Sequence, residues 1–171
     1  SDRPDRTMLQ PERCKPLDPT DLRLLDLLQD DASLSNQDLA ARAHVSPATC
    51  MRRVRRLVDS GVIERRVALL SQAGLGIGLS TIVEITLDRQ GAEHLAAFEQ
   101  RAVADAAVQQ CYRVSPGPDF VLVVWTADMS AYHAVVQRLF TQDANVRQVK
   151  AYFSVMRAKF EPRIDLRSLQ R

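Results

Sequence analysis

The sequence is poor in cysteine and histidine, and this excludes two kinds of site. Its 171 residues include three cysteines, odd in number and far apart, and three equally isolated histidines. Neither set has the spacing of a disulfide framework or of a zinc site. We therefore expect no metal and no cofactor, and we assign structural or surface roles to Cys14, Cys50, Cys111, His44, His94 and His133.

Long apolar runs and catalytic motifs are also missing. No run approaches the roughly 18 residues that span a membrane, and no secretory leader is visible, which predicts a cytoplasmic protein without a membrane partner. There is no GxSxG motif and no phosphate-binding loop, so we do not expect this protein to be an enzyme. The glycines at 74, 76 and 78 precede a strand pattern rather than a helix, which indicates a linker and not a dinucleotide site.

The charge is nearly balanced, but its basic side is almost entirely arginine. The formal net charge is +2, and of 23 basic residues only Lys15, Lys150 and Lys159 are lysine. The guanidinium group is a planar fork that suits phosphate and guanine edges. Residues 45–57, VSPATCMRRVRRL, place four arginines within five positions. Such a segment is either a solvated helix face or a surface that meets an anion.

This arginine-rich segment has the pattern of a helix anchored on one side. Ser46 before Pro47 is typical of an N-cap followed by a proline at the first helical position. At about 100° per residue, Cys50, Val54 and Leu57 fall on one apolar stripe. The other side and its flanks carry Ala48, Thr49, Arg52, Arg53, Arg55, Arg56 and Asp59.

A second short helix precedes this one, and the pair predicts a DNA-binding motif. Ser35 and Asp38 have capping-box spacing, and Leu39 and Ala43 are apolar four residues apart. Only residues 44–46 separate the two helices. Two short helices joined by such a turn, the second one basic, are typical of a helix-turn-helix whose second helix enters the major groove. We favour this interpretation over a solvated basic face.

The flanking segments complete this domain. Asp18 or Thr20 is the expected cap of a leucine-rich helix that precedes the pair and closes a small core. Beyond Gly61, a left-handed helix stop, VIERRVALL predicts a short extended segment, either a wing or a connecting strand. Arg65 and Arg66 on it either contact phosphate or are solvated edge charges.

The periodicity changes after residue 77. Alternating or continuous apolar stretches predict four strands, and two helical spacings fall between them, in the order βαββαβ. The short PGP turn makes the second and third strands a hairpin. This order predicts an α+β, ferredoxin-like sheet with both helices on one face. An apolar open face would need a partner, and dimerisation through the sheets is the natural remedy.

Both halves resemble one family. Residues 17–70, and above all SPATCMRRVRRL and the following GVI, resemble the DNA-binding half of the leucine-responsive/asparagine-responsive (Lrp/AsnC) transcriptional regulators. VEITL, CYRVSPGPDFVLVVWTADMSAY and the last strand resemble its ligand-sensing half. The resemblance implies a homodimer that assembles further, often to an octamer. It also implies that an amino acid or related small molecule modulates assembly or DNA affinity.

We therefore expect five segments. They are a flexible N-terminal arm over residues 1–16, a winged helix-turn-helix DNA-binding domain over 17–66, a linker over 67–78, a βαββαβ ligand-sensing and oligomerisation domain over 79–160, and a C-terminal tail over 161–171.

One turn departs from the family pattern. Where the family commonly has Gly-Asp-x-Asp, this chain has Pro116, Gly117, Pro118 and Asp119, followed by Phe120, and the resemblance makes these five the candidate effector-binding residues. The prolines remove backbone N–H groups that would hold a carboxylate. The family's Thr-x-Thr in the last strand is Val149 and Ala151 here. Asp119 either pairs with an effector ammonium group or caps the turn.

The predicted interface with double-stranded DNA assigns separate roles along the basic helix. Ser46, the helix N-terminus and Arg56 contact phosphate, while Thr49, Arg52 and Arg53 reach base edges. The full predicted set is Ser46, Pro47, Ala48, Thr49, Arg52, Arg53 and Arg56. A two-fold dimer would present two such helices to a pseudo-palindromic site.

Two other functions remain open at this point. The same helices suit an architectural protein that wraps DNA with low specificity on an oligomer. The helical domain would alternatively dock onto a protein, as in an enzyme subunit or metabolic sensor, although the outward arginines argue against this.

Overall fold

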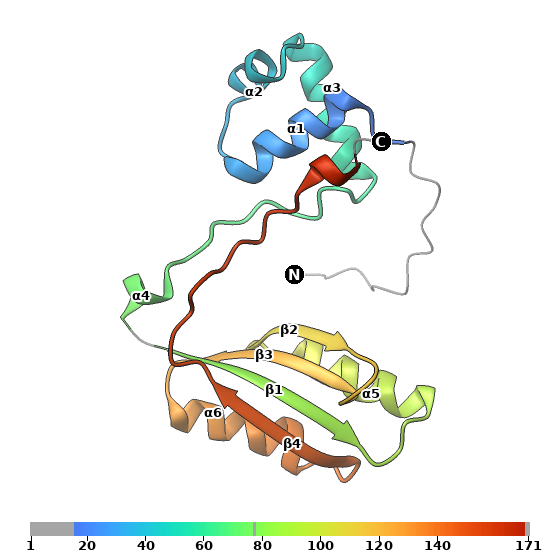
Figure 1. The fold of residues 1–171 in the computed structure, drawn as a ribbon, viewed down its shortest axis with the longest axis vertical. Helices are drawn as coiled ribbons and strands as arrows, with labels where there is room; N and C mark the ends of the chain where they lie inside the picture. The colour runs from blue at the N-terminus through green and yellow to red at the C-terminus, as the bar shows by residue number, and fades with distance from the viewer. Residues whose placement is uncertain (1–15, 77, 170–171) are drawn as a thin grey trace. The chain divides into compact units, whose positions relative to one another are not determined.

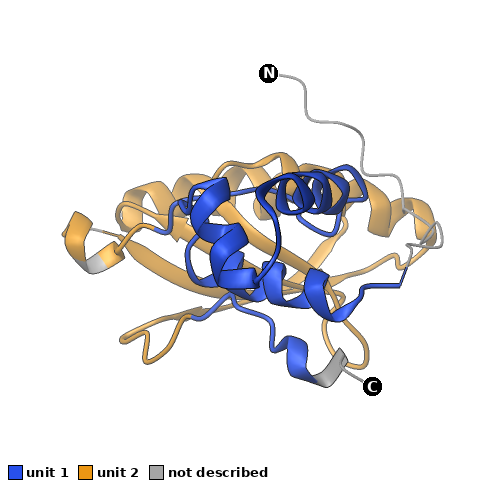
Figure 2. Cartoon of the chain, turned by 90° about the horizontal axis from the view of Figure 1, so that it is seen from above, with its two compact units in different colours: residues 1–69, 161–171 blue, residues 70–160 orange. Residues whose placement is uncertain are grey.

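A computed structural model describes residues 16–76 and 78–169 of the chain. The chain forms two compact units, Ser1–Leu69 together with Glu161–Arg171, and Leu70–Phe160 (Figure 2). It therefore leaves the first unit, forms the second, and returns to the first. Except for Pro16, the arm expected over residues 1–16 lies outside the described residues.

Three helices build the first unit: α1 (Pro19–Asp30), α2 (Asn36–Ala43) and α3 (Pro47–Asp59) (Figure 1). Side chains cap each start, because the side-chain oxygens of Asp18, Ser35 and Ser46 each accept a hydrogen bond from the backbone N–H three residues on. Each cap satisfies one of the donors that a helix start leaves unpaired. The caps at Ser35 and Ser46 confirm the sequence prediction, and of the two candidates for α1 it is Asp18, not Thr20, that caps the helix.

The core of this unit lies where the three helices meet. Leu24 of α1, Leu39 and Ala43 of α2, and Cys50 of α3 are buried together. The turn between α2 and α3 spans only residues 44–46, as predicted. His44 there adopts a left-handed conformation, with φ of 56°, which lets the chain reverse so quickly. A turn that short fixes α3 relative to α2.

The segment after Gly61, for which the sequence left a wing or a connecting strand open, forms no strand in the structure. Residues 64–71 form neither helix nor strand, and Val67, Leu69 and Leu70 are exposed. A strand needs a neighbouring strand to receive its backbone hydrogen bonds, and none of the described residues of this unit forms one. A short helix, α4 (Gln72–Leu75), then begins the second unit.

The second unit confirms the βαββαβ order. Strands β1 (Leu79–Leu87), β2 (Val108–Arg113), β3 (Phe120–Thr126) and β4 (Val146–Phe153) form an antiparallel sheet in the order β2-β3-β1-β4. Helices α5 (Ala92–Ala104) and α6 (Met129–Val135) connect them, and the last turn of α6 widens into a π-helix over Val136–Thr141.

Alternation along the strands places one sheet face against the helices. The buried cluster joins the sheet residues Val83, Ile85 and Leu122 to Phe98 of α5 and Val135 of α6. Both helices therefore cover one face, as a ferredoxin-like fold requires. The opposite face, here called the open face, carries Ile82 and Tyr152, which are 46% and 51% exposed.

Packing explains why the linker residue nearest the sheet, Gly78, is a glycine. Gly78 has φ of +128°, and a Cβ at this position would lie 2.5 Å from the indole nitrogen of Trp125. Only glycine permits both this conformation and this close approach.

No described helix is long and apolar enough to cross a membrane.

Candidate nucleic-acid interface

The N-terminal turn of α3 is presented to solvent. Ser46, Pro47 and Ala48 are exposed and Thr49 is half-buried. The Ser46 hydroxyl accepts the Thr49 backbone N–H at 3.2 Å and donates to the Thr49 hydroxyl at 2.9 Å. The side chain of Asn36, at the start of α2, donates to the Pro47 carbonyl at 2.9 Å. The turn is therefore held rigidly, with the positive end of the helix dipole facing outward.

Arg52 lies one turn further along the exposed side of α3. Its side chain is exposed, and it forms no ion pair with any residue that the structure describes. Arg55 is also exposed, and its Nε lies 3.9 Å from Asp59, four residues later on the same helix. An exposed pair at that distance is weak. The exposed arginines of α3 are thus available to an external anion.

Arg53 and Arg56 lie differently, because both contact carboxylates of α1. Arg53 Nη1 is 2.6 Å from Asp18 Oδ2 and 2.9 Å from Asp21 Oδ1. Arg56 Nη2 is 2.5 Å from Asp21 Oδ2. Asp21 is fully buried, so two of the arginines expected at DNA join α3 to α1.

The ion pairs change how the two carboxyl groups titrate. The hydrogen bond from Arg53 is the main cause that lowers the pKa of Asp18. For Asp21, burial raises the pKa, but the Asp18 N–H and the guanidiniums of Arg53 and Arg56 together outweigh burial and lower it. Both groups therefore stay ionised to a lower pH than an ordinary aspartate, which keeps the link between α1 and α3 charged.

Sequence reasoning missed this link for a definable reason. The helical wheel of α3 shows which side chains leave the core, but it carries no information about the neighbouring helix. The available signal was the pair Asp18 and Asp21 at the start of α1, whose capping box places two carboxylates together. Together with Arg52, Asp18 and the two paired arginines line a hollow of about 100 Å³.

The candidate effector turn is placed between β2 and β3. Asp119 Oδ2 accepts the Leu87 N–H at 2.7 Å and the Gln90 side-chain amide at 3.3 Å, and the Asp119 N–H donates to the Ile85 carbonyl at 2.8 Å. These bonds tie the turn to the end of β1 and to Gln90, and none of them goes from the Asp119 side chain to the backbone of its own turn.

The other four residues of that turn do not share one environment. Pro116 and Gly117 are exposed, and Pro118 is half-buried. Phe120 is completely buried, with its ring centroid 4.9 Å from that of Phe98. Its contacts are those of a core residue.

The fold and this surface define a class of protein. A helix-turn-helix unit with an exposed basic second helix is joined to an antiparallel sheet backed by two helices. Such a chain combines a DNA-reading element with a separate α+β domain.

Comparison with known proteins identifies the family. Residues 17–64 match the sequence profile described as winged helix-turn-helix DNA-binding, and residues 80–164 match that of the Lrp/AsnC ligand binding domain. The chain is 35% identical over 147 residues to an HTH-type transcriptional regulator of Haemophilus influenzae, covering 86% of this chain and 88% of the relative. It is 32% identical over 154 residues to the leucine-responsive regulatory protein of Escherichia coli, covering 90% and 94%.

A solved structure agrees with this result. A transcriptional regulator of Neisseria meningitidis, in complex with L-methionine, superposes with a TM-score of 0.81 at 26% identity, covering 90% of this chain and 99% of that one. The chain therefore belongs to the Lrp/AsnC family of transcriptional regulators. It is a DNA-binding regulator with a ligand-binding domain, and its family consists of regulators rather than enzymes.

Proposed function

We propose that the protein reads its operator with the N-terminal turn of α3 and with Arg52, while Arg53 and Arg56 hold α3 in position. The observation that carries this proposal is the different engagement of the three arginines. Arg52 is exposed, whereas the other two are bound to Asp21. A guanidinium that is free to reach a guanine edge is the commonest source of base specificity.

We also propose that the open face of the sheet joins two copies of the chain. Cross-strand pairing places Tyr152, Ile82 and Val123 in one row across β4, β1 and β3. Ile82 and Tyr152 are exposed and Val123 is half-buried, and apolar side chains gathered in this way are typical of an isologous interface. A dimer would present two α3 helices to a two-fold site and would be the unit of a higher oligomer, an octamer in the family pattern.

The effector that we propose is an amino acid. The Lrp/AsnC ligand-binding profile, the leucine-responsive relative and the relative bound to L-methionine support this class. In this chain, the two prolines at 116 and 118 offer no N–H to the effector carboxylate, and the Asp119 carboxylate already accepts two hydrogen bonds. We therefore expect the effector contacts to differ from the family pattern in this turn.

The test is a titration against a labelled DNA fragment from upstream of the protein's own gene. It is performed with excess random competitor DNA, with and without pools of amino acids. We expect specific binding that shifts with one pool. Equal affinity for fragment and competitor at physiological salt would contradict the proposal and favour an architectural protein. Specific binding that ignores every pool would contradict the amino-acid effector alone.

A further inference from the structure

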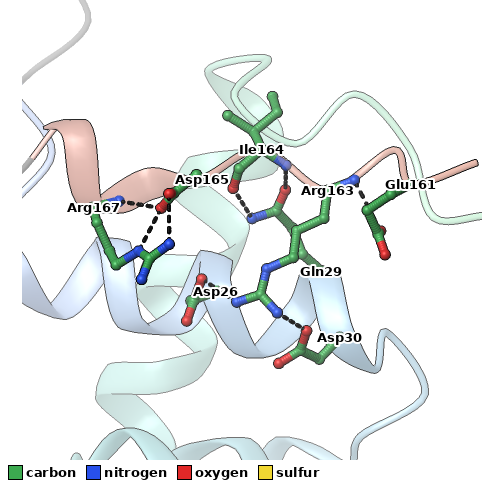
Figure 3. A network of polar contacts seen from close by, with 8 residues as sticks. All are labelled: Asp26, Gln29, Asp30, Glu161, Arg163, Ile164, Asp165 and Arg167. Carbon is green, nitrogen blue, oxygen red and sulfur yellow. Dashed lines mark hydrogen bonds and ion pairs between the residues drawn. The ribbon is translucent and has the colours of Figure 1, made fainter. Parts of the chain in front are cut away.

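Near its C-terminal end, α1 carries a second polar cluster, distinct from the carboxylates at its start that bind Arg53 and Arg56. Asp26, Gln29 and Asp30 follow one another at the spacing that brings side chains to one face of a helix. Leu24, which packs in the core with α2 and α3, lies on the opposite side of the helix, whereas Leu22 and Leu25 lie one turn before Asp26 and Gln29 and are buried. Figure 3 shows that residues 161–167, near the other end of the sequence, lie along it.

Two kinds of contact hold these residues against α1. Arg163 bridges both carboxylates, with Nη2 2.6 Å from Asp26 Oδ1 and Nη1 bound to Asp30. The Gln29 side-chain amide pairs with the backbone of Ile164 in both directions, because its Nε2 donates to the carbonyl at 3.1 Å and its Oε1 accepts the N–H at 2.7 Å. The ion pairs thus require an arginine at position 163, whereas the amide pair requires only extended backbone.

The next carboxylate along the segment is neutralised locally. Asp165 would add negative charge beside Asp26, but Arg167 donates to both of its oxygens, at 2.8 and 2.7 Å. The hydrogen bond from Arg167 is the main cause that lowers the pKa of Asp165 to about 2. The Arg163 guanidinium is the group of this segment that forms ion pairs with the acidic face of α1, while Glu161 accepts the Arg163 backbone N–H.

These contacts lie where the chain returns from the second unit to the first. Leu70–Phe160 form the second unit, and Glu161–Arg171 are grouped with the first. The first unit is therefore joined to the second at residues 69–70 and again at residues 160–161. A segment tethered in this way has a high effective concentration at its docking surface, so weak contacts suffice to hold it.

We propose that Asp26, Gln29 and Asp30 form a docking surface on α1 for the C-terminal segment, residues 161–169, of the same chain. Docking gives the helix-turn-helix unit a second attachment that salt weakens. Arg163, Asp26 and Asp30 are 35%, 51% and 56% exposed, so dissolved ions screen their attraction. This inference does not depend on which DNA or effector the protein binds.

The test measures hydrogen exchange at the Ile164 amide in the full chain, because this N–H is protected only while it is bonded to Gln29. Arg163→Ala should accelerate its exchange by roughly 3- to 10-fold at low salt. Arg157→Ala is the matched control, since it removes one arginine nearby whose guanidinium lies 5.0 Å from the Phe160 ring centroid. We expect the control to exchange like the parent.

Salt and dilution complete the test. Raising NaCl from about 50 to about 500 mM should accelerate exchange in the parent and change Arg163→Ala little. An Ile164 amide without protection in the parent at low salt would overturn the docking surface, as would equal effects of the two substitutions. Protection that disappears when the protein is diluted into monomers would overturn the same-chain partner and assign the segment to a second copy.

Discussion

Asp21 shows how much one buried carboxylate does in this fold. It lies inside the first unit, completes the capping box of α1 and receives the guanidiniums of Arg53 and Arg56 from α3. A carboxylate in this position is stable only because each charge has partners. The same side chain thereby helps to cap α1 and to orient α3.

Asp21→Asn should destabilise the first unit by about 2–4 kcal/mol. The amide keeps the size of the side chain but leaves two partly buried guanidiniums without their shared charge. Urea unfolding followed by helical circular dichroism measures the change. Asp59→Asn is the control, because its partner Arg55 is 83% exposed and 3.9 Å away. Equal stability of the two variants would contradict the assigned role.

The lowered pKa values of Asp18 and Asp21 predict how stability depends on pH. Both fall below the ordinary value of 3.8. The folded state therefore binds fewer protons than the unfolded state near that pH, so the stabilisation is complete above 3.8 and is lost as pH falls through the lowered values. Urea titrations should show the parent losing stability below about pH 4 more steeply than Asp21→Asn. Parallel curves would refute the linkage.

At the scale of elements, the turn between α2 and α3 determines how the basic helix is presented. His44 has φ of 56° in a turn of three residues. A left-handed conformation is unfavourable for a residue with a Cβ and is neutral for glycine. The sequence indicated the length of this turn but not which residue bears its strain.

His44→Gly should therefore change the free energy of unfolding of the first unit by between zero and about 1 kcal/mol in the stabilising direction. Glycine relieves the strain of the left-handed conformation, but it also adds conformational entropy to the unfolded chain. His44→Val should destabilise it, since β-branching disfavours the left-handed region further. Thermal unfolding of both variants gives the order of stability. A ranking with valine above glycine would be incompatible with the observed turn.

Sequence patterns predicted the elements better than the contacts between them. Ser35 and Ser46 were predictable as caps because a cap depends on neighbours within three residues, and the βαββαβ order followed from local periodicity. The pairing of Arg53 with Asp21 joins residues 32 positions apart, and that of Arg163 with Asp30 joins residues 133 apart. No local pattern encodes such pairs.

At the scale of the whole molecule, the proposal that two copies join through the open face of the sheet makes a testable prediction. Ile82 lies between Tyr152 and Val123 in its cross-strand row and is 46% exposed. Ile82→Arg should shift the protein toward monomer, because a guanidinium at this position would be desolvated without a partner in the interface. Sedimentation velocity measures the shift. Val103→Arg on α5, at a site 54% exposed, is the control and should leave assembly unchanged. Equal sedimentation of the two variants would exclude the open face as the interface.

The division of labour among the arginines of α3 is the central claim, and the specificity ratio of Arg52→Ala tests it most directly. The affinity for the upstream fragment and for random DNA is measured at one salt concentration, with Arg89→Ala in the second unit as a charge-matched control. We expect Arg52→Ala to lose about 1–3 kcal/mol on the specific fragment and little on random DNA. Equal losses of affinity on the specific fragment and on random DNA would contradict this division of roles. The same loss of specificity in Arg89→Ala would contradict it as well.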